Sequence, residues 1–261
     1  MFSLDGLRDI KVYQNRDGYR FSVDALLLYC FVTLHRAERI ADLGAGSGII
    51  GLLLARKYPE AQVLLVELQE SLAALAAKSI TLNGLDDRVR VMTADVKEVG
   101  SRLSAIHRLV SMTGVPQQGD NANQCGNMPD SFDLIVSNPP FRQTGTGRLS
   151  NGDEKAIARH EVMLSLEDLA AASSLMLKHH GRFCIIHLPE RLADICAVMR
   201  AHALEPKRLR FVHSSSSSEA KMLLVEAVKG ARPGLRTERP LVLYNEDGSY
   251  TQEVRECYVD R

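Results

Sequence analysis

Residues 39–51 read Arg-Ile-Ala-Asp-Leu-Gly-Ala-Gly-Ser-Gly-Ile-Ile-Gly, in which a short apolar run leads into a cluster of glycines. The run from Arg39 to Leu43 predicts a strand, and the spacing of apolar residues from Ile49 to Tyr58 predicts a helix. Glycines between a strand and a helix allow positive φ angles and let a ligand approach the backbone. The helix N-terminus adds N–H groups that have no partner inside the helix, so this segment predicts a ligand-binding loop.

The alternation of strand and helix continues along the chain. Further strands are expected at 61–67, 89–93, 132–137, 181–187, 209–212 and 221–228, and further helices at 69–83, 165–178 and 189–202. Such alternation is typical of an α/β fold, in which right-handed crossovers join the strands of a mostly parallel, doubly wound sheet. With the strand at 39–43 the sheet has seven strands, and we expect a single domain over residues 1–261.

The composition is that of an ordinary globular protein, with 45% hydrophobic and 25% charged residues. No apolar run approaches the roughly 20 residues that a membrane-spanning helix needs, and the N-terminus lacks the continuous apolar stretch of a secretion signal. We therefore expect a cytoplasmic location and no membrane partner. The five cysteines are scattered without a CxxC pair, which argues against a disulfide framework and against a zinc site, so no metal is expected.

The charge balance weighs against a polyanionic partner. Lys plus Arg and Asp plus Glu both total 32, so the chain as a whole offers no electrostatic attraction to nucleic acid. Any nucleic-acid surface must be a local patch of basic residues.

Two segments interrupt the alternation. Residues 97–130 form a long connection whose second half is polar and rich in Gly, Asn and Gln, which predicts a surface insertion. Near the C-terminus, Asn-Glu-Asp-Gly lies between two short β-prone runs, so residues 240–261 are expected to form a hairpin and tail.

Two classes of nucleotide cofactor fit the glycine cluster. Gly46, Gly48 and Gly51 satisfy the G-x-G-x-x-G pattern of NAD-dependent oxidoreductases, and Glu67 follows at the distance where an acidic residue binds a ribose in either class. A tight turn that binds nothing is the remaining alternative. Asp42 separates the two classes, because its carboxylate would repel a pyrophosphate but attract the ammonium group of S-adenosyl-L-methionine, directly or through water.

Asp95 is a further candidate for the cofactor site. It follows the strand expected at 89–93, at the edge of the sheet where the glycine cluster also lies, and can accept a hydrogen bond from an adenine amino group. Capping of a loop is the simpler role for an aspartate at such a position.

The strand expected at 132–137 runs into Asn138-Pro139-Pro140-Phe141. The combination of DLGAGSG with a downstream NPPF resembles the class I methyltransferases that act on planar amino groups: adenine N6, guanine N2 and the glutamine amide. The resemblance implies a Rossmann-like class I fold with an antiparallel strand near the C-terminal end of the sheet, and S-adenosyl-L-methionine as cofactor. It also implies that these four residues are catalytic, with the Asn138 side-chain oxygen and the Pro139 carbonyl accepting hydrogen bonds from the target amino group.

The implied chemistry has a physical basis. An aryl amine is a poor nucleophile because its lone pair is delocalised, and two acceptors that hold both hydrogens out of plane direct that pair toward the methyl group. A strong general base is unnecessary before attack, because the proton becomes acidic only after the nitrogen is alkylated. Phe141 offers an aromatic face on which a base that has left its stack can lie.

The N-terminal residues narrow the resemblance. Tyr13-Gln14 and residues 18–25 (GYRFSVDA) are similar to the start of the bacterial valine-tRNA adenine-N6 methyltransferases, and the similarity extends from about Leu7 to about Gly230. It implies that residues 1–36 form a segment that closes over the cofactor, although a capped amphipathic helix explains the same residues. The residues expected to bind the cofactor are Phe21, Ser22, Val23, Asp24, Asp42, Gly44, Gly46, Gly48, Glu67, Leu68, Asp95, Val96 and Asn138.

The family resemblance implies an RNA partner, a tRNA with the target adenine in its anticodon loop. The candidate local patch for its backbone follows NPPF and consists of Arg142, Arg148, Lys155 and Arg159. His160 belongs to an Arg-His-Glu string that resembles one in this family, so it is included on the substrate side. A solvated loop explains the same residues without a partner.

Three alternatives stay open. A guanine-N2 or protein-glutamine methyltransferase shares the motif, although glutamine enzymes usually end it in Tyr, so Phe141 favours a base. An NAD-dependent oxidoreductase would need a Tyr-Lys or His-based catalytic site, which the sequence does not show. A binding module without activity is disfavoured by the intact NPPF.

Overall fold

A computed structural model describes residues 2–15, 23–99, 131–139 and 164–259. In chain order its elements are β1 (Phe2–Leu7), β2 (Ile10–Asn15), α1 (Val23–Phe31), β3 (Arg39–Leu43), α2 (Ile49–Lys57), β4 (Gln62–Glu67), α3 (Glu70–Leu82), β5 (Val89–Thr93), β6 (Phe132–Ser137), α6 (Leu166–Met176), β7 (Leu177–His187), the 3₁₀ helix η2 (Pro189–Arg191), α7 (Leu192–Ala201), β8 (Leu204–His213), β9 (Ala220–Lys229), β10 (Arg236–Thr237), β11 (Leu241–Val242) and α8 (Gln252–Tyr258). The described part of the chain contains no helix that is long and apolar enough to cross a membrane.

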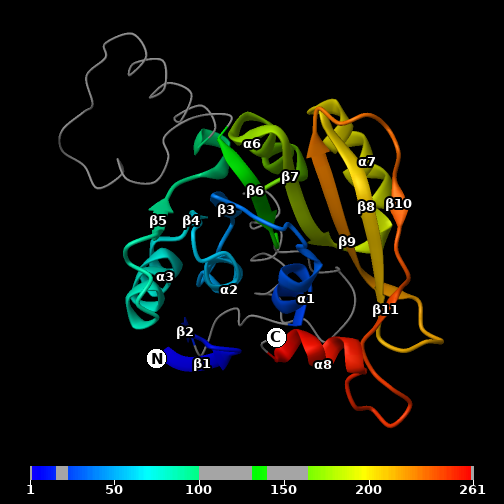
Figure 1. Ribbon diagram of the computed structural model, residues 1–261, viewed down its shortest axis with the longest axis horizontal. Helices are drawn as coiled ribbons and strands as arrows, with labels where there is room; N and C mark the ends of the chain where they lie inside the picture. The colour runs from blue at the N-terminus through cyan, green and yellow to red at the C-terminus, as the bar shows by residue number, and fades with distance from the viewer. Residues whose placement is uncertain (1, 16–22, 100–130, 140–163, 260–261) are drawn as a thin grey trace, which may run out of the picture.

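The main sheet has nine strands in the order β10-β8-β9-β7-β6-β3-β4-β5, with β11 beside β8 (Figure 1). Strands β7, β6, β3, β4 and β5 are parallel neighbours, and β9 is antiparallel to both β7 and β8. The α/β class, the mostly parallel sheet and the antiparallel strand near the C-terminal end are therefore confirmed. The seven expected strands are all present, and the two extra ones, β10 and β11, contain only two residues each.

Helices cover both faces of the sheet, because its strands are apolar on both sides (Figure 1). One core packs α1, α2, α3 and α8 against one face, and it includes Ile40 and Leu65, both fully buried. The second core packs α6 and α7 against the other face around Phe183 and Ile185. This three-layer arrangement leaves the carboxyl ends of the parallel strands as an edge that loops can build upon.

Two elements are longer as strands than the sequence predicts. The helix expected at 165–178 ends at Met176, because Leu177 is already extended and pairs with Phe132 of β6. Strand β8 begins at Leu204 and not at 209, since Pro206 lies at a shift of register where its missing N–H is tolerated. In both cases the pairing of strands in the sheet, and not the local sequence pattern, determines where the element begins or ends.

The N-terminal residues form a hairpin that the sequence analysis did not anticipate. Strands β1 and β2 pair over Phe2 to Asn15, and β2 is bound to the end of α3, where Lys11 N and Tyr13 N donate to the side chains of Asn83 and Ser79 at 3.0 Å. The C-terminal end of α3 lies away from the carboxyl edge of the sheet. The expectation that all of 1–36 covers the cofactor is thus corrected for residues 2–15, which pack against a helix instead.

The C-terminal tail combines the expected hairpin with an additional helix. An antiparallel bridge joins Tyr244 and Tyr250, as the Asn-Glu-Asp-Gly turn predicts. The chain then forms α8, which the sequence analysis missed; the Thr251 side chain caps it by accepting a hydrogen bond from Val254 N at 3.5 Å. Its buried residues, Val254 and Cys257, join the core beneath α1.

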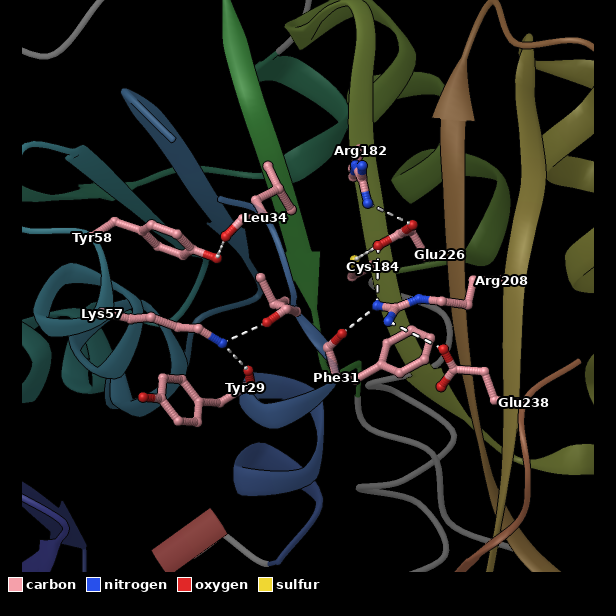
Figure 2. Close-up of polar contacts among 11 residues, drawn as sticks. Tyr29, Phe31, Leu34, Lys57, Tyr58, Arg182, Cys184, Arg208, Glu226 and Glu238 are labelled. Carbon is pink, nitrogen blue, oxygen red and sulfur yellow. Dashed lines mark hydrogen bonds and ion pairs between the residues drawn. The ribbon is translucent and has the colours of Figure 1, made fainter. Parts of the chain in front are cut away.

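Two cations from distant elements hold the C-terminal end of α1 (Figure 2). Lys57, the last residue of α2, donates to the carbonyls of Tyr29 and Val32, and Arg208 of β8 donates to that of Phe31. Both charges lie where a helix C-terminus attracts cations. Arg208 also pairs with the buried Glu226 at 3.2 Å, so α1 is fixed to both α2 and the sheet.

The irregular pairing of β6 with β7 around Gly181 provides a test of the fold. A Cβ added at Gly181 would lie 2.8 Å from the Phe132 carbonyl oxygen and 2.9 Å from that of Lys178. We expect Gly181→Ala to lower the free energy of unfolding by about 1–3 kcal/mol, because backbone atoms cannot move aside as a side chain can. Urea denaturation measures the change. Gly6→Ala is the matched control, since a Cβ there meets no atom within 4 Å, and an equal loss in both variants would contradict the prediction.

Candidate functional site

The carboxyl edge of the sheet brings four separate segments together. Strands β6, β3, β4 and β5 are adjacent and parallel there, with Asp42 opposite Val136, Leu43 opposite Val66, and Glu67 opposite Thr93. The segments that follow these strands therefore lie side by side. They contain the described residues that the sequence analysis selected beyond α1, although the four loops are separated by up to about 90 positions in the chain.

The glycine loop after β3 adopts the conformation that its sequence predicts. Gly44, Gly46 and Gly48 have φ angles of +74°, +57° and +87°, a region that other residues rarely adopt. Gly44 N and Ala45 N donate to Val66 O at 2.9 Å, which holds the loop against the end of β4. A Cβ at Gly46 would meet no atom within 4 Å, so the loop is open to a ligand at this point.

Asp42 is a buried carboxylate with one unused oxygen. Its side chain is only 1% exposed; Oδ2 accepts a hydrogen bond from Gly51 N at 2.9 Å. Among the residues that the structure describes, Oδ1 has no hydrogen-bond partner. Burial, and secondarily the nearby Glu67, raises the pKa of this carboxyl group to about 7, against the hydrogen bond from Gly51. An unpartnered buried acceptor of this kind fits a cationic or water ligand that the protein itself does not supply.

Glu67 joins two loops of the site. Its Oε2 accepts from Gly46 N and its Oε1 from Gln69 N, both at 2.8 Å, and the residue is 6% exposed. Each carboxylate oxygen keeps a second lone pair, so ribose hydroxyls can still donate to it. The ribose contact of Glu67 is an expectation from the sequence, whereas its role in shaping the glycine loop is seen only in the structure.

The segment after β5 contains Asp95, for which a loop-capping role and a cofactor contact were both considered. Its Oδ1 accepts from Lys97 N at 3.0 Å, which is the capping role. It lies at the same edge as Glu67, because Ala94 N donates to Glu67 O at 3.1 Å. Leu68 is 36% exposed at this edge, whereas Val96 is 4% exposed and packs into the second core, so Val96 contributes mainly to packing.

Asn138 and Pro139 follow β6 beside the glycine loop. Ser137 Oγ donates to Leu43 O at 2.7 Å in the buried edge, tying the last residues of β6 and β3 together. Asn138 and Gly44 directly follow the two residues that this hydrogen bond joins. Asn138 is half-buried and Pro139 is buried.

The other expected site residues are only partly within the described chain. Val23 and Asp24 form the first turn of α1 and are half-buried. Nine expected residues lie outside the described residues: Phe21, Ser22, Pro140, Phe141, Arg142, Arg148, Lys155, Arg159 and His160. His187, the last residue of β7, lies at the same edge and is 8% exposed, yet the sequence analysis did not select it. Its signal in the sequence was a polar residue directly after the apolar run from Phe183 to Ile186.

The electrostatics of the edge distinguish the two cofactor classes. Two buried carboxylates, Asp42 and Glu67, flank the glycine loop, and the Gly46 N–H that could bind a phosphate is already paired with Glu67. A dinucleotide pyrophosphate would therefore meet negative charge at the loop, where Gly46 N–H is already engaged. The ammonium and ribose hydroxyls of S-adenosyl-L-methionine are donors, and the acceptors present here fit them.

Comparison with known proteins agrees with this geometry. Residues 22–106 match the family model described as the Methyltransferase small domain. A protein from Bacteroides thetaiotaomicron named tRNA1(Val) (adenine(37)-N6)-methyltransferase is 26% identical over 259 residues, which cover 97% of this chain and 95% of the relative. A protein of the same name from Porphyromonas gingivalis is 30% identical over 223 residues, covering 84% of this chain and 78% of that protein.

Solved structures show the same fold. A predicted O-methyltransferase from Agrobacterium tumefaciens has a TM-score of 0.63 at 24% identity, covering 91% of this chain and 99% of that chain. The 16S rRNA N2 G1207 methyltransferase of Thermus thermophilus, solved with AdoMet and guanosine, has a TM-score of 0.54 at 18% identity. The match covers 87% of this chain and 50% of that chain.

The raised pKa of Asp42 gives a prediction about stability. The folded protein holds the proton up to about pH 7 whereas the unfolded chain releases it near 3.8, so the free energy of unfolding decreases as pH rises between these values. We expect Asp42→Asn, which keeps an acceptor for Gly51 N, to stabilise the ligand-free protein at pH 8 by on the order of 2–4 kcal/mol. The gain should shrink toward pH 5.

Thermal melts of both proteins at pH 5 and pH 8 provide the measurement. Asp247→Asn is a control, because that carboxylate is exposed and its pKa is lowered by hydrogen bonds from Ser249. A melting temperature of Asp42→Asn that is lower than the parent's at pH 8 would contradict the prediction.

Proposed function

The chain belongs to the tRNA1(Val) (adenine(37)-N6)-methyltransferase family, and from this membership we propose that it methylates the exocyclic N6 amino group of an adenine in a tRNA anticodon loop. S-adenosyl-L-methionine is the methyl donor. The observation that carries the proposal is the position of Asn138 and Pro139, which follow β6 directly beside the glycine loop. A cytoplasmic location follows from a tRNA substrate.

Asn138 and Pro139 provide the acceptors for the target amino group. The Asn138 side-chain oxygen and the Pro139 carbonyl each accept one N6 hydrogen, which localises the nitrogen lone pair. Proline fixes the backbone angle at 139, so its carbonyl keeps its direction when substrate binds. Pro140 and Phe141 complete the motif, and Phe141 stacks on the extruded base.

The residues around the glycine loop bind and orient the cofactor, which supplies an electrophilic methyl group on a sulfonium. Asp42 Oδ1 would accept a hydrogen bond from the ammonium group of the cofactor, directly or through one water molecule, and Glu67 would accept hydrogen bonds from its ribose hydroxyls. Asp95 would accept from the adenine amino group of the cofactor, and Phe21, Ser22, Val23 and Asp24 are proposed as further cofactor-binding residues. Binding of the ammonium favours the ionised form of Asp42, whose pKa is about 7 without ligand.

Arg142, Arg148, Lys155 and Arg159 are proposed to hold the RNA backbone, with His160 on the substrate side. In the sequence they follow the catalytic motif within about 20 residues. A local patch of four cations is compatible with a net charge of zero for the whole chain.

Asn138→Ala tests the catalytic role. We expect methyl transfer to an anticodon stem-loop to fall at least roughly a hundredfold, because the lost acceptor acts mainly in the transition state. Affinity for S-adenosylhomocysteine, measured by calorimetry on the same variant, should change little and so controls for folding. Loss of that affinity with unchanged turnover would move Asn138 to the cofactor side.

A salt series tests the proposed RNA surface. Removing Arg142 and Arg148 together should flatten the dependence of log affinity on log salt by about 1.4–1.8, because fewer counterions are released. The matched control is Arg36→Ala/Arg232→Ala, which removes the same charge near the amino ends of β3 and β8. Equal slopes in both double variants would contradict the proposed RNA-binding patch. Methylation of a protein glutamine, with no RNA methylated, would contradict the proposed RNA substrate.

A further inference from the structure

Two cysteines that are distant in the chain meet between the first and the last helix of the described residues. Cys30 lies in the last turn of α1, Cys257 lies in α8, and both helices pack into the same core (Figure 1). A hydrogen bond joins the two thiol groups. Neither cysteine is among the residues assigned above to the cofactor or the substrate. The two lie far apart in the chain and form no CxxC motif, so the sequence alone does not indicate the pair.

The surroundings of the pair make Cys257 the more reactive thiol. The hydrogen bond from Cys30 lowers the pKa of Cys257 and outweighs burial, which acts in the opposite direction. Arg8 and Arg210 also lower this pKa, and Glu253 opposes them. The same hydrogen bond, together with burial, raises the pKa of Cys30. A thiolate with a protonated thiol beside it is the arrangement of a nucleophilic cysteine and its resolving partner.

Both thiols can be reached by a small oxidant. They line a cavity of about 670 Å³, whose lining includes the exposed residues Thr33, Glu253 and Val259, so the cavity opens at the surface. Hydrogen peroxide is little larger than a water molecule, which occupies roughly 30 Å³ in the liquid, and it therefore fits. Cys184 provides the contrast, because it is fully buried, its thiol donates to Glu226 at 3.8 Å, and burial raises its pKa.

We propose that Cys30 and Cys257 are a redox-sensitive pair, which hydrogen peroxide oxidises to a reversible disulfide. The Cys257 thiolate attacks one peroxide oxygen, so an S–O bond forms, the O–O bond breaks, and the released hydroxide takes a proton from solvent to become water. The Cys30 thiol then attacks the sulfenic acid sulfur. An S–S bond forms, the S–O bond breaks, and the Cys30 proton leaves with the hydroxide as a second water. The two thiols lose two electrons in total, and the peroxide gains them.

The disulfide ties the C-terminal segment to the rest of the protein. It closes a loop that contains most of the chain, because one cysteine lies in α1 and the other in α8. A cross-link of this kind stabilises a fold chiefly by restricting the unfolded chain, and more so for a longer loop. In a reducing compartment such a bond is transient, so the stabilisation follows the supply of oxidant. This inference does not depend on methyl transfer, since neither thiol takes part in it.

Peptide mapping of the whole chain tests the pair. The reduced parent is treated with hydrogen peroxide, remaining thiols are blocked with N-ethylmaleimide, and the protein is digested with trypsin without reductant. Cys30 falls in tryptic peptide 21–36 and Cys257 in peptide 256–261, so a disulfide between them gives a linked pair of defined mass. Cys30→Ser and Cys257→Ser are the test variants. Cys196→Ser is the matched control, because Cys196 is a half-buried cysteine on α7, against the other face of the sheet.

The expected result separates the roles of the two thiols. The parent and Cys196→Ser should give the linked peptides, and dithiothreitol should release them. Cys30→Ser should instead accumulate a sulfenic acid at Cys257, which dimedone labels, whereas Cys257→Ser should leave Cys30 largely unoxidised. In thermal melts the oxidised parent should unfold at least about 5 °C above the reduced parent. This shift should be absent in both test variants.

Two results would overturn the inference. One is a parent that gives no linked peptides after peroxide treatment, whether Cys257 is recovered blocked or further oxidised, and this result requires no variant to fold. The other is a disulfide that joins Cys30 or Cys257 to a different cysteine or to a second chain. An unchanged melting temperature in a parent that contains the linked peptides would contradict the stabilising effect of the bond.

Discussion

The hydrogen bond between the buried Asp42 carboxylate and Gly51 N is the constraint on which the site depends. Gly51 N, in the first turn of α2, donates to Asp42 Oδ2, near the end of β3, at a distance of 2.9 Å. The loop between them contains three glycines with positive φ angles. A Cβ at Gly51 would lie 2.1 Å from Leu65 Cδ2, so any larger residue there requires the buried Leu65 side chain to move. The conformation of the loop therefore depends on a carboxyl group whose charged form burial disfavours.

At the carboxyl edge of the sheet, the acidic side chains of Asp42 and Glu67 bind the backbone of the glycine loop and also offer acceptors to a ligand. Glu67 satisfies two loop N–H groups while keeping lone pairs for a ligand, and Asp42 has one oxygen engaged and one without a partner among the described residues. In the ligand-free protein these carboxylates repel each other and oppose burial. A cationic, hydroxyl-rich cofactor relieves both penalties, so binding and local stability are coupled through the same two side chains.

Much of this arrangement could be predicted from the sequence, and the reasons are local. The segments at 39–43, 89–93 and 132–137 form strands with the expected bounds, because each is a short apolar run followed by turn-forming residues. The loops after parallel strands necessarily meet at one edge, so Asp42, Glu67 and Asn138 could be grouped before their distances were known.

The parts that could not be predicted depend on contacts between distant segments. Strand β8 includes Pro206 because a register shift accommodates it, and the hairpin of residues 2–15 exists because α3 provides polar partners at Ser79 and Asn83. Helix α8 is short and gains its stability from burial against α1, and no local sequence pattern predicts this contact.

The two short strands after β9 affect how the molecule behaves toward its own copies. Strand β8 would otherwise end the sheet with a row of unpaired backbone groups, a template for edge-to-edge association. Residues 236–237 and 241–242 pair with it at two points, and Glu238 N and Leu243 N add bonds to Leu209 O and His213 O at 2.8 Å. Pro240 stands between them and cannot donate to a further strand. The C-terminal segment thereby protects the sheet against aggregation along this edge.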